Sequence, residues 1–195
     1  GELLLFLIVT MAYINLMEDR NVFEKLKSIL LRSCCGYLTI FWLTGVISFF
    51  ISALVDNLTT ALVMSTIVIA IGKDNKKFVT MACVNVIVCA NAGGAFSPFG
   101  DITTLMMWQA GIVAFNEFFE IFLPSLVNAL IPAIIMSFFL PKIEAQTIIQ
   151  EKVFFKKGAI MSIVLFIATI ITAIAFEYLL HLPPTLGMMT GLGYV

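Results

Sequence analysis

Two acidic side chains stand within otherwise apolar parts of this sequence. Asp56 lies between the apolar stretches 36–55 and 58–72, and Asp101 follows the glycine-rich stretch 93–100. A charged side chain at the centre of a bilayer costs about 2.5–3.5 kcal/mol on insertion scales, so it usually has a partner or a task. These two aspartates are therefore the first candidates for chemistry.

Further oxygen-bearing side chains accompany both aspartates. They are Ser52, Asn57, Thr59, Thr60, Asn91, Ser97, Thr103 and Thr104. Carboxylate, amide and hydroxyl oxygens are the ligands that hard cations prefer. The pattern predicts a site for a small monovalent cation, with Asp56, Asn57 and Asp101 as its metal ligands.

A proton and a cation would compete for such a carboxylate, because each is favoured by the same negative charge. Alternating access would then turn this competition into an exchange of the two ions. The plainer interpretation is that Asp56 and Asp101 cap the helices that follow them. We expect both to cap, but Ser or Asn would serve equally well there, which favours an additional ion-binding role. No catalytic residue and no cofactor is expected.

The composition suits a lipid bilayer. Hydrophobic residues make up 61% of the 195 residues and charged residues 12%, with a mean hydropathy of +1.08, whereas about a quarter of the residues in soluble domains are charged. The net charge of −1 gives no indication of nucleic-acid binding, and the four cysteines lack metal-ligand spacing. We predict an all-α, polytopic membrane protein with one transmembrane domain over 1–195.

Hydropathy divides the chain into apolar segments separated by basic connectors. The apolar segments are 3–17, 36–55, 58–72, 78–92, 101–113, 118–140, 158–180 and 185–195. The connectors 18–32, 73–77 and 141–157 carry the lysines and arginines, so the positive-inside rule assigns all three to the cytoplasm.

Residues 36–72 must then leave and re-enter on one side of the membrane. The second arm is shorter than the ~20 residues of a full crossing, so we predict a re-entrant helical hairpin with Asp56 and Asn57 at its tip. Residues 78–113 form a broken helix, because 93–100 contains three glycines and a proline. Residues 114–117 form a connecting turn on the outer side, and residues 118–140 and 158–180 form transmembrane helices. Irregular backbone at membrane depth is typical of the ion site in secondary transporters.

Two longer stretches carry a family resemblance. Residues 52–64 (SALVDNLTTALVM) and 91–104 (NAGGAFSPFGDITT) resemble the signature stretches of NhaD-type sodium/proton antiporters, within the ion transporter superfamily. The resemblance extends to 11–20 and 181–189 and so covers nearly all of the chain. It implies an inverted-repeat transporter of which this chain is the N-terminal portion and first half.

The resemblance also implies which side chains form the first half of the ion path. They are Ser52, Asp56, Asn57, Asn91, Asp101, Thr103 and Thr104. Related carboxylate carriers have Ser at the tip position where this chain has Asp56, which favours transport of a cation alone.

The expected function is exchange of sodium (or lithium) for protons across a bacterial inner membrane, with an organelle envelope as the second location. The expected partners are Na⁺, H⁺ and the lipid bilayer, with a homodimer as one candidate assembly. Two rivals stay open. One is a sodium-coupled carboxylate or oxyanion transporter of the same superfamily, and the other is a membrane scaffold without transport.

Overall fold

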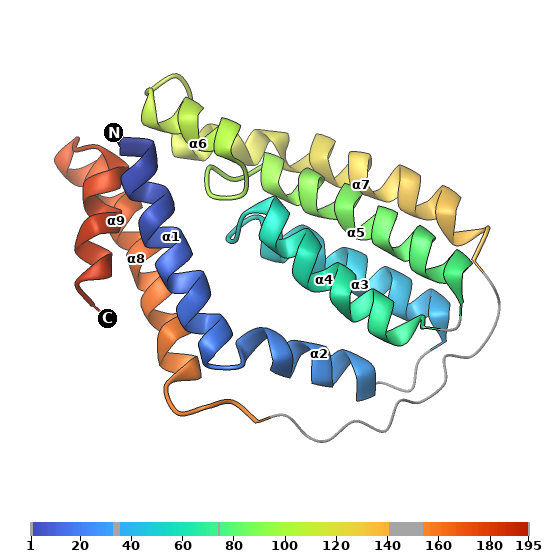
Figure 1. Cartoon of the computed structure of the whole chain (residues 1–195). Helices are drawn as coiled ribbons and strands as arrows, with labels where there is room; N and C mark the ends of the chain where they lie inside the picture. The colour runs from blue at the N-terminus through green and yellow to red at the C-terminus, as the bar shows by residue number, and fades with distance from the viewer. Residues whose placement is uncertain (1, 33–35, 74, 141–153, 195) are drawn as a thin grey trace. The chain divides into compact units, whose positions relative to one another are not determined.

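The computed structural model describes residues 2–32, 36–73, 75–140 and 154–194, and every regular element in these ranges is helical (Figure 1). The elements are α1 (Glu2–Asp19), α2 (Val22–Arg32), α3 (Tyr37–Ser52), α4 (Asn57–Ile71), α5 (Lys76–Ala95), α6 (Ile102–Gln109), the 3₁₀ helix η1 (Phe115–Ile121), α7 (Phe122–Ser137), α8 (Ala159–Leu180) and α9 (Pro184–Leu192). Most of the predicted connector 141–157, together with Cys34 and Cys35, lies outside the described residues.

Three helical stretches of the described chain are long and apolar enough to cross a membrane. They are Lys76–Ala95, Phe115–Ser137 and Ala159–Leu180. The helices α3 and α4 are equally apolar but have only 16 and 15 residues. The prediction of an all-α, polytopic membrane protein is confirmed.

The chain forms two compact units. The first contains α1, α8 and α9 together with residues 109–112. The second contains α3, α4, α5, η1 and α7, together with α6 up to Trp108. Every predicted site residue belongs to this second unit.

In the first unit, two glycines one helical turn apart bring α9 against α8. A Cβ atom at Gly187 would lie 2.5 Å from the Cα of Ala173, and one at Gly191 would lie 2.4 Å from the hydroxyl of Thr169. Small residues at this spacing let membrane helices approach closely. Tyr13 of α1 is fully buried beside them, where its hydroxyl donates to the Gly191 carbonyl (2.7 Å) and accepts from Thr169 (2.8 Å).

In the second unit, α3 and α4 form a hairpin, α5 packs against both arms, and α7 packs against α5. The α3–α5 contact includes a polar side chain that the sequence analysis overlooked. Asn85 is fully buried, and its amide donates to the Phe41 carbonyl (3.1 Å). Gly45 makes room for it, since a Cβ there would lie 2.5 Å from the Asn85 amide nitrogen.

Two stretches treated as connectors contain helix. Residues 22–32 form α2, because Phe23, Leu26 and Leu30 recur at helical spacing between the lysines. The basic side chains of this stretch, which assigned it to the cytoplasmic side, drew attention away from the helical spacing of its apolar residues. The predicted outer turn at 114–117 begins the 3₁₀ helix η1, where the Glu117 carboxylate accepts the Ala114 N–H (2.8 Å).

Replacing Tyr13 by Phe is expected to destabilise the first unit, because it removes a buried hydroxyl that links three helices. The Gly191 carbonyl keeps the Tyr194 N–H (3.0 Å) as a partner, and the Thr169 hydroxyl keeps the Leu165 carbonyl (2.8 Å). The expected cost is therefore that of a lost net hydrogen bond, about 0.5–1.5 kcal/mol. The measurement is thermal unfolding of the full-length protein in detergent. Tyr194→Phe is the matched control, since that hydroxyl meets Thr172 (3.0 Å) at an exposed position and its loss should leave the midpoint nearly unchanged. Equal shifts for both variants would contradict the role of Tyr13.

Candidate functional site

The tip of the α3–α4 hairpin carries the first predicted aspartate. Helix α3 ends at Ser52 and α4 begins at Asn57, with Asp56 as its N-cap. The Asp56 carboxylate accepts the backbone N–H of Thr59 at 2.8 Å. The expected capping role of Asp56 is confirmed, and this bond directs one carboxylate oxygen to its own helix.

The interruption between α5 and α6 carries the second aspartate. Helix α5 ends at Ala95 and α6 begins at Ile102, directly after Asp101. One carboxylate oxygen of Asp101 accepts the backbone N–H (2.8 Å) and the hydroxyl (2.7 Å) of Thr103. Asp101 therefore caps α6, as expected, through one oxygen, and its second oxygen points elsewhere.

Asn57 joins the hairpin tip to the helix break. Its side-chain amide donates to the second carboxylate oxygen of Asp101 (2.8 Å) and to the amide oxygen of Asn91 (2.9 Å). Its backbone N–H donates to the Gly100 carbonyl (3.0 Å). A single residue thus ties α4, α5 and the interrupted segment together.

The glycines of the break allow the hairpin to come this close. A Cβ atom at Gly93 would lie 1.9 Å from the Phe49 carbonyl oxygen of α3. One at Gly100 would lie 2.4 Å from the Ser52 carbonyl oxygen and 2.3 Å from the Cα of Gly94. The glycines therefore do more than weaken the helix, because they also remove the side chains that would separate α3 from α5.

Ser52 has a buried hydroxyl without a hydrogen-bond partner, and no other buried side-chain N or O atom of the described residues lacks one. Its neighbours on the same helical face behave differently. Thr44 donates to the Ile40 carbonyl (2.8 Å), and Ser48 donates to the Thr44 carbonyl (2.7 Å). Ser52 occupies the next turn, beside Gly94. Its oxygen is therefore a buried polar atom without the hydrogen bond that its neighbours on this face have.

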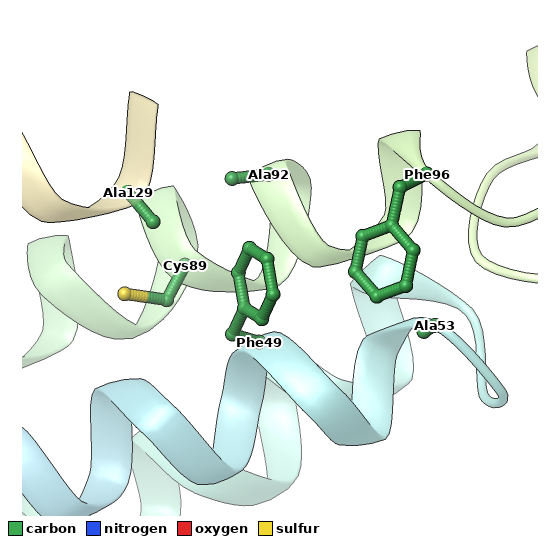
Figure 2. Packing of buried hydrophobic residues seen from close by; sticks show 6 residues of the cluster. All are labelled: Phe49, Ala53, Cys89, Ala92, Phe96 and Ala129. Atoms are coloured by element: carbon green, nitrogen blue, oxygen red, sulfur yellow. The ribbon is translucent and has the colours of Figure 1, made fainter. Parts of the chain in front are cut away.

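Aromatic side chains pack on both ends of the interrupted segment. Phe96 stacks on Phe49 of α3, with ring centroids 5.2 Å apart, in the apolar cluster of Figure 2. Phe99 meets Trp108 edge-on at 5.3 Å. These contacts pack Phe96 against α3 and Phe99 against α6.

The remaining predicted residues have secondary roles in the geometry. The Thr104 hydroxyl lies 2.9 Å from the carbonyl oxygens of Ser97 and Asp101, to which it can donate, and so holds the break onto α6. The Thr60 hydroxyl makes a long bond to the Val55 carbonyl (3.4 Å). The sequence predicts that backbone carbonyls freed by the break contribute oxygens, but it does not identify the Gly100 carbonyl, which accepts the Asn57 N–H (3.0 Å).

The oxygens of Asn91 and Asp101 converge on one point, which the Asn57 amide group occupies. Within the described residues there is no cluster of three His, Cys, Asp or Glu side chains that could hold a metal. Amide, hydroxyl and carboxylate oxygens of this kind are the ligands that hard cations prefer.

Replacing Gly93 by Ala is expected to separate the hairpin from α5, because the new methyl would overlap backbone that no side-chain rotation can move. Overpacking of this kind costs about 1–3 kcal/mol. Thermal unfolding of the full-length protein measures it. Gly36→Ala is the control, since no atom lies within 4 Å of a Cβ there. An unchanged midpoint for Gly93→Ala would refute the close approach.

Several known proteins are similar to this chain in sequence. The Na⁺/H⁺ antiporter NhaD of Vibrio cholerae is 54% identical over 195 residues, which are all of this chain and 41% of that protein. The Na⁺/H⁺ antiporter NhaD of Alkalimonas amylolytica is 52% identical over the whole chain, or 40% of that protein. Sodium/proton antiporter 1 of Arabidopsis thaliana is 28% identical over 99% of this chain and 34% of that protein.

The chain spans about two fifths of the length of the bacterial relatives. No solved structure matches it. A sequence model described as "Citrate transporter" matches residues 1–192. Since that match extends over nearly the whole sequence, the chain belongs to the citrate transporter family.

Proposed function

We propose that the protein exchanges Na⁺ (or Li⁺) for protons across a membrane, with the ion site between the hairpin tip and the helix break. The observation that carries this proposal is the junction at Asn57, where Asn91 and Asp101 direct oxygens to one point. The similarity to bacterial proteins named Na⁺/H⁺ antiporters supports the same cargo.

The Asn57 amide can act as a stand-in for the cation. Its NH₂ group carries partial positive charge and satisfies the oxygens of Asn91 and Asp101 at 2.9 and 2.8 Å. A half-turn of the terminal amide would replace that group by the Asn57 oxygen. The Asn57 side chain would also have to move back from the oxygens of Asn91 and Asp101, so that a cation could bind between the three oxygens. The buried Ser52 oxygen at the same tip is a further ligand in this proposal.

Protons would compete with the cation at the two aspartates. Protonation of Asp101 removes the charge that attracts the cation and leaves a neutral group, which the hydrogen bonds from Asn57 and Thr103 can still orient. Asp56 would serve as the second ionisable group at the tip. Cation and proton would thus bind alternately, and exchange follows once the site opens to each side in turn.

The proposal also includes the arrangement of the helices in the membrane and the assembly of the full-length protein. The α3–α4 hairpin is re-entrant, and α5, the break and α6 form a broken membrane helix. A second, inverted repeat in the full-length protein would supply the other half of the site. The bacterial relatives support a bacterial inner membrane, and a homodimer is the proposed assembly.

The family description raises citrate as a rival cargo, but the charges of the site favour a cation. Segments 36–72 and 78–113 contain both aspartates and no Lys, Arg or His. A carboxylate substrate would meet two negative side chains without a cationic side chain from these segments to balance them, and bringing together like charges is unfavourable. Uptake of labelled citrate by the full-length protein, insensitive to Asp101→Asn, would favour the rival.

Replacing either Asp56 or Asp101 by Asn is expected to reduce exchange at least ~10-fold, because hydrogen bonds and contacts to a charged group contribute about 1.5–3 kcal/mol. Sodium-driven proton movement in inverted vesicles containing the full-length protein measures this. Glu120→Gln, at an exposed position outside the site, is the matched control and should retain exchange. Retained exchange in an aspartate variant would remove that residue from the mechanism.

Replacing Ser52 by Ala separates ion binding from folding. Because the Ser52 hydroxyl has no hydrogen-bond partner, its removal should leave the thermal midpoint in sodium-free buffer unchanged or higher. The sodium-dependent rise of the midpoint, which any ion bound by the native state produces, should shrink. A lower midpoint without sodium, together with an intact sodium effect, would show that Ser52 is structural only.

A further inference from the structure

The segment leading into α8 is fastened to the turn between α1 and α2. The backbone N–H of Lys156 donates to the Arg20 carbonyl (3.3 Å), and its ammonium donates to the Asp19 carbonyl (3.0 Å). The Arg20 guanidinium donates in turn to the Lys157 carbonyl. These bonds lie within the first compact unit and fix residues 154–158 against the end of α1.

This fastening gathers cations and aromatic rings on one surface. The Lys25 ammonium lies 5.6 Å from the ring centre of Phe154 and 6.0 Å from that of Phe155. Both rings are nevertheless exposed, at 70% and 44%. The Lys157 side chain is also exposed. We name this surface, formed by Arg20, Lys25, Phe154, Phe155, Lys156 and Lys157, the basic-aromatic corner.

The corner lies directly before a candidate membrane span. Helix α8 is a candidate membrane span that begins at Ala159, directly after these residues. At the end of a membrane span, lysine and arginine side chains reach the phosphate layer, and phenylalanine rings beside them bury at the boundary between headgroups and acyl chains. The exposed rings and cations therefore face lipid headgroups and not bulk water alone.

We propose that the basic-aromatic corner binds the phosphate of an anionic lipid. The Lys25 and Lys157 ammonium groups contact the phosphate, and the Phe154 and Phe155 rings enter the adjoining acyl region. Arg20 and Lys156 donate to backbone carbonyls and position the other four side chains. The inference concerns the periphery of the carrier and does not depend on which ion it transports.

Acidic side chains near the corner should weaken its binding of an anionic lipid. Glu18, Asp19 and Glu24 lie on the same stretch of α1 and α2 as Arg20 and Lys25. Their negative charge repels a lipid phosphate. Attraction of the phosphate therefore depends on the ammonium groups of Lys25 and Lys157, which lie close to it in this proposal. Removing the exposed Asp19 carboxylate should therefore tighten binding, whereas removing the lysines should weaken it.

A reporter variant, Phe154→Trp, tests the site in the full-length protein reconstituted into vesicles. The fluorescence of the introduced tryptophan is the difference in emission between this variant and the parent protein. Phosphatidylglycerol with brominated acyl chains should quench it more strongly than brominated phosphatidylcholine does. The K25Q/K157Q double variant should lower this preference by about fivefold per lysine. K76Q/K77Q, with the same change in charge at the start of α5, should keep it. Inorganic phosphate in excess should not reverse it.

Several outcomes would overturn the proposal. Equal quenching by the two lipids shows that the corner has no anionic-lipid preference, and a preference retained in K25Q/K157Q assigns it to other residues. Reversal by inorganic phosphate identifies a soluble anion as the ligand. Should the double variant fail to fold, Asp19→Asn still decides, because an unchanged or weaker preference in that variant contradicts the electrostatic argument.

Discussion

The contact between Asn57 and the helix break is the constraint on which the second unit depends. Two interruptions of helical backbone lie between apolar segments, where unpaired N–H and C=O groups are costly. The Asn57 N–H satisfies the Gly100 carbonyl, and the Asn57 side chain satisfies Asn91 and Asp101. Each interruption thus supplies hydrogen-bond partners that the other lacks, so neither is expected to persist alone.

This mutual pairing requires the two backbones to approach closely, and the surrounding residue types follow from that requirement. Gly93 and Gly100 leave room where any Cβ would overlap the α3 backbone. Phe49 and Phe96 then fill the space beside the contact by stacking. Glycines that allow close approach and phenylalanines that fill the adjoining space together hold the irregular backbone in one position. A binding site for a small ion requires this, because each ligand atom must lie within a few tenths of an ångström of its binding position.

The sequence could predict the two interruptions because their signals are local. An acidic residue between apolar arms and a glycine-rich stretch are each visible within about ten residues of chain, and both aspartates cap helices as expected. It could not predict that Asn57, and not Asp56, makes the bonds across the site. That choice depends on contacts between residues 34 and 44 positions apart. Tyr13 and Asn85 escaped notice for the same reason, since a buried polar group is explained by its distant partner.

The distribution of charge connects the fold to ion exchange. All eleven Lys and Arg residues lie in the three connectors or at their borders with helices, whereas Asp56 and Asp101 lie between apolar segments that contain none. Asn57, Thr59 and Thr103 donate hydrogen bonds to these carboxylates but carry no net charge. Under the proposed function, Na⁺ and H⁺ would neutralise these carboxylates in turn, and the absence of Lys and Arg from the two segments supports that proposal.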